Sequence, residues 1–275
     1  MKTKVSEMKD QAFSPFFSSY GFRCSKDLNP FLNLDIFNMS QPTFPPHPHA
    51  GFSAVTYLFT SSQGSFKNRD SNGDNSIIEP GGLHWTQADH GMLHEEIPII
   101  PGINSFGLQM FIKTPIAKEE EQGKAFHLSP SEIQTFSGDG YIVRLLTGEY
   151  NNQVSMLTKI YPLLNFLDIE LDKTKSISLN SSLEKTTLLV CIKGSIEIEK
   201  HNILKQNEVF EIQESDILLK IIGVEASNQF LFLSADSLKE DYFWNGPFCL
   251  STQAKLIDAR ERFQSGKMGY LSPSF

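Results

Sequence analysis

Runs rich in Val, Ile, Phe and Thr recur along the chain, and this pattern predicts strands far more often than helices. The segment G-F-S-A-V-T-Y-L-F-T at 51–60 is rich in aromatic and β-branched residues, and 103–113 has the same character. Between them, the polar, turn-rich residues 61–76 are expected to form a long hairpin loop, and 77–86 to resume as a strand that Pro-Gly-Gly interrupts. Residues 11–45 show little helical periodicity and predict short strands and loops.

The second half of the chain repeats this pattern. Turns containing Gly, Asn or Asp separate most of its apolar segments at intervals of roughly 8–15 residues, which is typical of a sandwich or barrel. Only residues 254–264 carry apolar side chains at helical spacing, and they predict one outer helix that ends before Gly266. The predicted strands of this half are 141–146, 166–171, 187–192, 195–199, 209–212, 217–222 and 230–233.

A change of composition marks the expected boundary between two domains. The charged stretch 118–124 is followed by Ser-Pro-Ser at 129–131. A chain of 275 residues is long for one domain and comfortable for two. The pattern therefore predicts an all-β fold of two β-barrels in tandem, with domains at 1–125 and 126–275 and a short C-terminal helix.

Composition and charge narrow the class of protein. The formal net charge of −8 argues against non-specific nucleic-acid binding, which needs a basic surface. Cys24, Cys191 and Cys249 are far apart and show no C-x-x-C spacing, so neither a disulfide framework nor a thiolate zinc site is expected. The first ten residues lack the apolar core of a signal peptide, and no run of 18 apolar residues predicts a membrane span. We expect a cytoplasmic protein that contacts neither nucleic acid directly nor a membrane.

Two short stretches hold the candidate chemistry. His47 and His49 flank Pro48, which favours extended backbone at the preceding residue, and residues two apart in a strand point to the same face. His94 and Glu96 have the same spacing. If both strands line one barrel interior, three imidazoles and one carboxylate converge on a site suited to iron, manganese, nickel, copper or zinc. A four-ligand octahedral site leaves two positions for water, substrate or dioxygen, whereas a closed tetrahedral zinc site leaves none.

A plainer interpretation competes with this one. A single His-Pro-His is more often a loop with exposed histidines than a metal site. In the second stretch, Glu95 competes with Glu96 as the residue that faces the barrel interior. The strand interpretation with His94 and Glu96 is preferred because its spacing matches that of the first pair.

Two further histidines lie near the second pair. His84 is open to a role as a surface or core residue. His90 precedes His94 by four residues, a spacing that would matter only on a helix. Gly91 and Pro98 make a long helix improbable there, which again favours a strand.

Taken together, these stretches resemble the pirin family of bicupins, proteins with two cupin-type β-barrels. The shared motifs are F-P-x-H-P-H-x-G-F, the P-G-x-L-x-W-x-x-A turn and G-x-L-H-x-E-x-P. The resemblance covers about residues 40–112, and a weaker match continues at 161–169 and at N-G-P-F, 245–248. The stretches that carry it are F-P-P-H-P-H-A-G-F-S-A-V-T-Y at 44–57, E-P-G-G-L-H-W-T-Q-A-D-H-G-M-L-H-E-E-I-P at 79–98 and G-L-Q-M-F at 107–111.

The resemblance implies a metal site in the N-terminal cupin. In the family pattern, His-x-His and His-x-Glu hold a single non-haem iron, and by position the ligands here are His47, His49, His94 and Glu96. Fe(II) is the expected metal. Manganese, nickel, copper and zinc are alternatives that the ligand set does not distinguish.

The chain also departs from the family pattern. His84 stands where the family often has Gln and His90 where it often has Arg, so neither is needed as a ligand. Ala50 replaces Arg and Ser53 replaces Glu, and both changes remove charge beside the metal strand. The second half has no His-x-His, and His201 is isolated in a polar turn, so the C-terminal cupin is expected to be metal-free.

Some pirin relatives are similar to quercetin 2,3-dioxygenases, which cleave the flavonol ring with dioxygen and release carbon monoxide. This resemblance implies that the metal binds the deprotonated flavonol hydroxyl as a Lewis acid before dioxygen attacks. Glu96, or Glu95 if the strand face is misjudged, would take the hydroxyl proton as general base. The expected ligands are then a small aromatic substrate and dioxygen.

A flat polyphenol needs a pocket with aromatic and apolar walls. Phe44, Phe52, Trp85 and Met92 are candidates because they are close to the metal motifs in the sequence. At least half of the four are expected to be ordinary barrel core instead.

Two other functions are open. Other pirin relatives are non-enzymatic cofactors that bind transcription regulators or metabolic enzymes, and there the iron acts as a redox sensor and the partner is a protein. A metal-stabilised storage or scaffold protein is a third reading. The dioxygenase is preferred because an open metal site is ready for chemistry.

Overall fold

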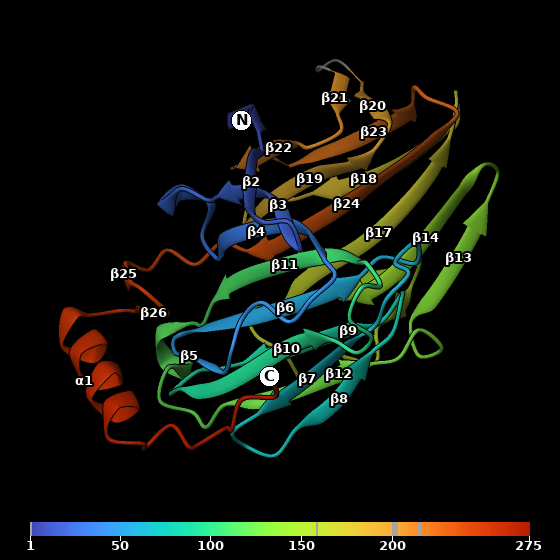
Figure 1. Ribbon diagram of the computed structural model, residues 1–275. Coiled ribbons are helices and arrows are strands. Elements are labelled where there is room, and N and C mark those ends of the chain that lie inside the picture. Colours follow the sequence, from blue (N-terminus) through green and yellow to red (C-terminus); the bar gives the residue numbers. More distant parts are fainter. Residues whose placement is uncertain (1, 158, 200–202, 214–215) are drawn as a thin grey trace. The chain divides into compact units, whose positions relative to one another are not determined.

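The computed structural model describes residues 2–157, 159–199, 203–213 and 216–275 (Figure 1). These residues form two compact units, each assembled from two separate parts of the chain. The N-terminal unit consists of Asp10–Pro130 and Leu238–Phe275, and the C-terminal unit of Met1–Lys9 and Ser131–Ser237. The boundary expected between residues 125 and 126 stays a prediction, and the terminal segments of the chain are exchanged between the units.

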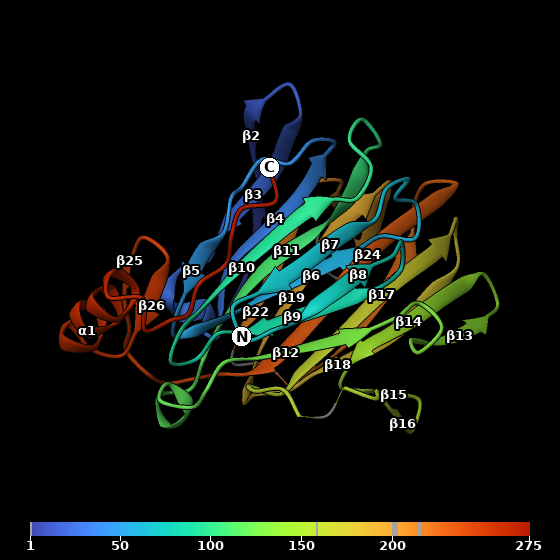
Figure 2. The same ribbon diagram turned by 60° about the horizontal axis from the view of Figure 1, so that its bottom comes forward.

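Two antiparallel sheets make up most of the N-terminal unit (Figures 1 and 2). The smaller sheet has the strand order β5 (His47–His49), β10 (Met92–Pro98), β7 (Phe66–Asp70) and β8 (Asn75–Ile78). The larger sheet has the order β12 (Lys124–Leu128), β9 (Leu83–Gln87), β6 (Phe52–Leu58), β11 (Ser105–Lys113), β4 (Phe31–Met39), β3 (Phe17–Arg23) and β2 (Lys9–Ser14).

Strand β4 shows how the sequence builds this unit. It reads F-L-N-L-D-I-F-N-M, and its alternate residues point to opposite faces of the sheet. Leu34 and Ile36 are buried on one face. Asp35, Phe37 and Met39 point to the other face and line a cavity that residues of β5 and β10 also line. The two sheets therefore face each other across this cavity.

The segment 61–76, expected to be a loop, contains strands β7 and β8. Strand β7 alternates between buried and half-buried residues. Two of its buried residues, Asn68 and Asp70, are polar, so the sequence lacks the alternation of apolar and polar residues that predicts a strand. Asp70 Oδ1 accepts hydrogen bonds from the backbone N–H groups of Asn72 and Asp74, at 2.8 and 2.9 Å, and this closes the tight turn to β8.

The C-terminal unit has the same plan, with a seven-stranded and a four-stranded antiparallel sheet among its described residues. Each of the seven segments predicted from the second half overlaps one of its strands. The smaller sheet has the order β18 (Ser176–Ser181), β23 (Ile217–Gly223), β20 (Ser195–Ile198) and β21 (Ile203–Lys205). The larger has the order β1 (Lys2–Glu7), β22 (Glu208–Gln213), β19 (Lys185–Lys193), β24 (Ser227–Asp236), β17 (Leu164–Asp172), β14 (Tyr141–Thr147) and β13 (Gln134–Gly138).

Short elements complete the two units. The ribbon β15 (Glu149–Tyr150) and β16 (Gln153–Val154) belongs to the C-terminal unit. The N-terminal unit contains two short 3₁₀ turns, η1 (Lys26–Leu28) and η2 (Ile116–Lys118), and the ribbon β25 (Phe243–Asn245) and β26 (Phe248–Leu250). His201 lies outside the described residues.

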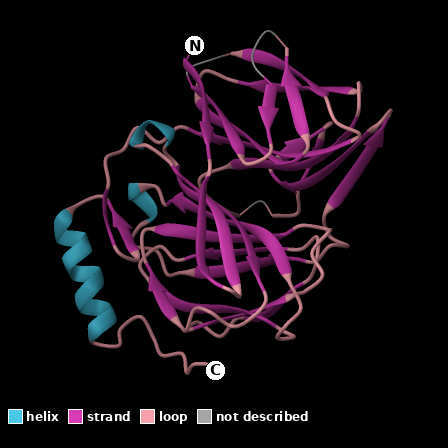
Figure 3. Cartoon of the chain, turned by 45° about the horizontal axis from the view of Figure 1, so that its top comes forward, coloured by secondary structure: helices cyan, strands magenta, loops and turns pink. Residues whose placement is uncertain are grey.

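The predicted C-terminal helix is confirmed as α1, Gln253–Gln264 (Figure 3). Thr252 caps its first turn, because its hydroxyl accepts a hydrogen bond from the backbone N–H of Lys255 at 3.2 Å. Ala259 is the buried residue of the helix and packs in a small cluster with Ala50 and Phe248. No helix of the described residues is long and apolar enough to cross a membrane. The all-β prediction with one short helix is confirmed.

Candidate metal centre

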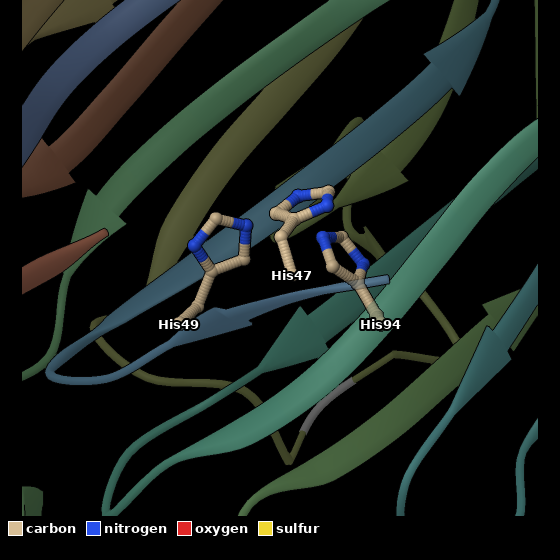
Figure 4. Close-up of side chains that lie close together, drawn as sticks. All are labelled: His47, His49 and His94. Atoms are coloured by element: carbon tan, nitrogen blue, oxygen red, sulfur yellow. The ribbon is translucent and has the colours of Figure 1, made fainter. Parts of the chain in front are cut away.

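Neighbouring strands bring three histidines together. His47 and His49 lie on β5, and His94 lies on β10, directly opposite His47 in the antiparallel register. The three rings rise from the same side of these strands (Figure 4), with ring centroids 4.7 or 4.8 Å apart. One nitrogen from each ring lies within 4.8 Å of the others. The two-residue spacing seen in the sequence thus places both β5 imidazoles beside that of β10.

Local backbone contacts fix the end of β5. Gly51 has a φ of +78°, and an added Cβ would lie 2.1 Å from the backbone oxygen of Cys249. Ala50 accepts a hydrogen bond of 3.0 Å at its carbonyl from the Cys249 N–H. Only glycine tolerates both the positive φ and this close approach, so the residues after His49 are pinned to β26.

The replacements of charged residues near β5 lie in packed surroundings. Ala50 is fully buried and packs against Leu93, Phe248 and Met268. Ser53 is also fully buried, and its hydroxyl finds no hydrogen-bond partner among the described residues. A charged side chain at either position would lose its hydration, and no oppositely charged residue of the packed surroundings described above would compensate for that cost.

The electrostatics of the cluster favour neutral imidazoles. Burial lowers the pKa of His47 and holds the pKa values of His49 and His94 well below the usual range, and the neighbouring histidines lower the latter two further. His47 Nδ1 lies 2.9 Å from the Pro45 carbonyl and donates to it, which leaves Nε2 as the acceptor nitrogen. The buried Nδ1 of His94 has no hydrogen-bond partner in the described part of the chain, whereas a hydrogen bond with the Pro247 carbonyl raises the pKa of His49 against the effect of burial. Neutral rings, one of them with an unsatisfied buried nitrogen, fit a transition-metal ion.

Glu96 lines the same cavity but is not one of the three residues whose ligand atoms lie close together. The side chain is 8% exposed, and its Oε2 accepts a hydrogen bond of 2.8 Å from the Thr56 hydroxyl. Burial raises the pKa of Glu96 to about 7, against the lowering effect of Thr56. A carboxyl group with this pKa can accept or release a proton near neutral pH.

Glu95 points to the opposite face of β10. Its carboxylate accepts hydrogen bonds from Arg69 Nη2 at 2.6 Å, and from the hydroxyl and backbone N–H of Ser274 at 2.5 and 3.1 Å. Burial raises the pKa of Glu95, but these hydrogen bonds outweigh it and the pKa is lowered. Of the two adjacent carboxylates, Glu96 faces the cavity and Glu95 fastens β10 to the C-terminal segment.

The two other histidines lie outside the cluster. His84 is fully buried on β9, with Nε2 3.9 Å from Asp74 Oδ2, and burial lowers its pKa to about 4, so the ring is neutral. His90 has a side chain 40% exposed, with Nδ1 3.1 Å from Glu120 Oε2. Neither belongs to the set of close ligand atoms.

A cavity of about 230 Å³ lies beside the histidine cluster. Several strands around it each contribute two lining residues that are two positions apart in the sequence. Phe44, a candidate from the sequence, lines it. Phe52, Trp85 and Met92 are almost fully buried and are not among the lining residues, so these three belong to the core.

Sequence reasoning missed several lining residues, although a signal was present. A polar residue followed two positions later by Phe occurs on three strands, and both members of each pair line the cavity. The pairs are Gln11 and Phe13 on β2, Asp35 and Phe37 on β4, and Gln109 and Phe111 on β11.

The fold and the site define a bicupin whose N-terminal unit holds a candidate metal centre. The family model for pirin matches residues 6–112, and that for the pirin C-terminal cupin domain matches residues 166–269. The chain therefore belongs to the pirin family.

Relatives and solved structures agree with this assignment. Human pirin is 28% identical over 260 residues, which cover 89% of this chain and 84% of that protein. The crystal structure of quercetin 2,3-dioxygenase from Acinetobacter baumannii has a TM-score of 0.86 at 26% identity, and the match covers 97% of both chains. The bacterial pirin YhhW from Escherichia coli, solved in complex with nickel(II), shares the fold with a TM-score of 0.67 at 13% identity, over 86% of this chain and 100% of that one.

Proposed function

We propose that this protein is a metal-dependent dioxygenase that acts on flavonols such as quercetin. His47, His49, His94 and Glu96 would hold one divalent metal ion, with Fe(II) as the proposed species. The observation that carries the proposal is the cavity itself: a cluster of neutral histidines, of which His49 and His94 are buried and His47 is half-buried, and a buried carboxyl group stand at the wall of a pocket lined by phenylalanines. The similarity to a structure named quercetin 2,3-dioxygenase supports the substrate class.

When bound, the metal ion would supply a Lewis-acid contact for the flavonol hydroxyl and a centre for dioxygen chemistry. The protein's own contribution is to receive a proton. In the metal-free protein burial raises the pKa of Glu96 to about 7, which makes this carboxylate a stronger base than an exposed one and suits it to accept the hydroxyl proton. Thr56 holds the carboxylate through the 2.8 Å hydrogen bond and keeps its orientation toward the cavity.

The cavity walls orient the substrate and exclude water. Phe111 packs 5.5 Å from the His49 ring, centroid to centroid, and Phe44 packs edge-on against Phe17 at 5.1 Å. Aromatic side chains in this arrangement offer apolar faces to a flat ring system. The polyphenol would therefore lie among phenyl rings with one hydroxyl at the histidine end.

The test is elemental analysis of protein produced with iron available, followed by oxygen uptake with quercetin. We expect one dioxygen consumed and one carbon monoxide released per flavonol. His47→Ala and Glu96→Ala should abolish uptake, whereas His90→Ala, a histidine outside the cluster, should retain it. Nickel(II) is the second metal to load, because the fold relative YhhW was solved with it.

Two outcomes would contradict the proposal. One is full metal content without oxygen uptake on any flavonol. The other is uptake that persists in His47→Ala after metal removal. In the first case, a protein partner whose binding depends on the redox state of the metal would favour the non-enzymatic sensor instead.

A further inference from the structure

A row of polar side chains crosses the seven-stranded sheet of the N-terminal unit. Antiparallel partners point to the same face, so the register places these side chains side by side. Thr56 reaches Glu96, and Gln109 and Asp35 line the cavity, so this part of the row faces inward. The row runs His127, His84, Thr56, Gln109 and Asp35, and continues to Gly21 on β3.

Asp35 is the carboxylate of this row and stands two strands from Thr56. It is half-buried, its Oδ2 accepts a hydrogen bond from Asn33 Nδ2, and its Oδ1 lies 3.4 Å from the Ser19 hydroxyl. Burial raises the pKa of Asp35, against the lowering effects of these hydrogen bonds and of Arg23. A carboxylate offers about four acceptor sites, so one good and one long hydrogen bond leave capacity for a ligand.

The neighbouring backbone makes room for this group. A Cβ on Gly21 would lie 2.4 Å from Gln11 Nε2 and 2.7 Å from Asp35 Oδ1. Glycine at this position therefore allows the Gln11 amide and the Asp35 carboxylate to approach each other. Both of these side chains line the cavity.

The order of the strands separates two polar groups along the cavity wall. Asp35 stands two strands from Thr56 in the register, a separation of about 10 Å at the usual distance between neighbouring strands. Glu96, which Thr56 holds, is therefore separated by two strands of the cavity wall from Asp35, which Gln11 and Ser19 accompany. Phe37 and Phe111 are among the apolar walls of the cavity.

We propose that Asp35 is a second anchor of the cavity, which accepts a hydrogen bond from a hydroxyl group at the end of the substrate remote from the histidines. The substrate class is then an aromatic molecule of at least two rings with hydroxyl groups at both ends. This inference rests on the proposed flavonol dioxygenase function and deepens it, because Asp35 would select polyhydroxylated flavonols over those with a single hydroxyl.

The experiment measures binding to the metal-loaded protein without oxygen, so that no turnover occurs. Quercetin has hydroxyl groups at both ends, and 3-hydroxyflavone has only the hydroxyl expected at the histidine end. Tryptophan fluorescence or calorimetry gives the affinity ratio of the two probes. We expect Asp35→Leu to lower this ratio about 10- to 100-fold, the loss of a hydrogen bond to a charged group, and Asp35→Asn about 3- to 10-fold.

Asp10→Leu is the matched control. Asp10 is exposed on β2 beside Gln11, and adjacent residues of a strand point to opposite faces. It should leave the ratio unchanged. Gly21→Ala keeps the carboxylate but crowds it, and should lower the ratio as well, while circular dichroism checks that each variant is folded.

Several results would overturn the inference. They are an unchanged ratio in both Asp35 variants, an equal fall in Asp10→Leu, and no binding of either flavonol by the wild-type protein. Oxygen uptake is measured separately on the same proteins. If quercetin binds but no uptake occurs, the dioxygenase proposal fails, while the affinity ratio still decides the role of Asp35.

Discussion

Thr56 donates a hydrogen bond of 2.8 Å to Glu96, from β6 of one sheet to β10 of the other. Both groups are buried, and the same hydroxyl lies 3.3 Å from Gln109 Oε1. The contact ties the Glu96 carboxyl group, which lines the cavity together with the histidines, to the polar row of the larger sheet. It therefore links the metal end of the cavity to the residues that stand further along it.

Replacing Thr56 with Val tests this link. The hydrogen bond lowers the pKa of Glu96, so its removal should raise that pKa above about 7. In the metal-free protein, the midpoint of Glu96 ionisation, followed by infrared or NMR spectroscopy, should therefore move to higher pH by about one unit. Thr60→Val, on an exposed residue after the same strand, should leave the midpoint in place. An unmoved midpoint in Thr56→Val would mean that this hydrogen bond does not stabilise the ionised carboxylate.

Metal binding should raise the thermal stability of the protein through the histidine cluster. A ligand at 100 times its Kd adds about 2.7 kcal/mol to the free energy of unfolding. The midpoint temperature of thermal unfolding of the wild-type protein should rise when Fe(II) is added without oxygen. In His94→Ala most of this rise should be lost. His90→Ala should keep it, because its half-exposed ring lies outside the cluster. Equal gains in the two variants would place the ion elsewhere.

Glu96 gives the metal-free protein a defined dependence on pH. Its pKa is about 7 in the folded state and 4.5 in the reference state, so the folded protein binds the proton more tightly. The stabilising contribution is present below pH 4.5 and is lost as the pH rises through 7. Relative to Glu96→Gln, wild-type protein should therefore lose about 3 kcal/mol between pH 4.5 and pH 8.

Urea unfolding of both metal-free proteins at these two pH values gives the difference directly. The comparison with Glu96→Gln cancels the opposite contribution of the buried histidines, which is present above pH 6.5 and lost on acidification. A difference that stays constant with pH would show that the pKa of Glu96 is not raised in the folded protein.

The outer face of β10 depends on the Arg69–Glu95 ion pair. The Glu95 side chain is fully buried, so Arg69→Met leaves a carboxylate held only by Ser274. We expect a loss of about 2 kcal/mol in the free energy of unfolding, since an uncompensated buried charge is costly. Lys67→Met, on the same strand two residues earlier, is the control and should cost much less. Urea titrations measure both, and similar losses would refute a specific role for the ion pair.

The strand period made much of this structure predictable. His47 and His49 share a face because residues two apart in a strand do so, and the same rule separates Glu95 from Glu96. The strands of the second half were predictable for a different reason, because short runs rich in apolar and β-branched residues are separated by turn residues. Strand β7 was not, since Asn68 and Asp70 fill buried positions that the period reserves for apolar side chains.

The cavity walls were harder to predict, because they come from strands distant from the metal motifs in the sequence. Phe52 and Trp85 are close to those motifs but pack in the core, whereas Asp35 and Phe37 arrive from β4. The local sequence pattern predicts where a strand lies, but not which strands are its neighbours in the sheet. The contact of Ser274 with Glu95 spans 179 positions and has no local signal.

The exchange of terminal segments has a consequence for how the protein is made. Residues 131–237 leave the ribosome before residues 238–275, yet the latter pin Gly51 and close over Glu95. During synthesis, the N-terminal unit therefore lacks the contacts of its last segment until residues 131–237 have also been translated. A fragment truncated near residue 130 would lack these contacts. An isolated metal-binding unit should therefore be produced as residues 10–130 joined to residues 238–275.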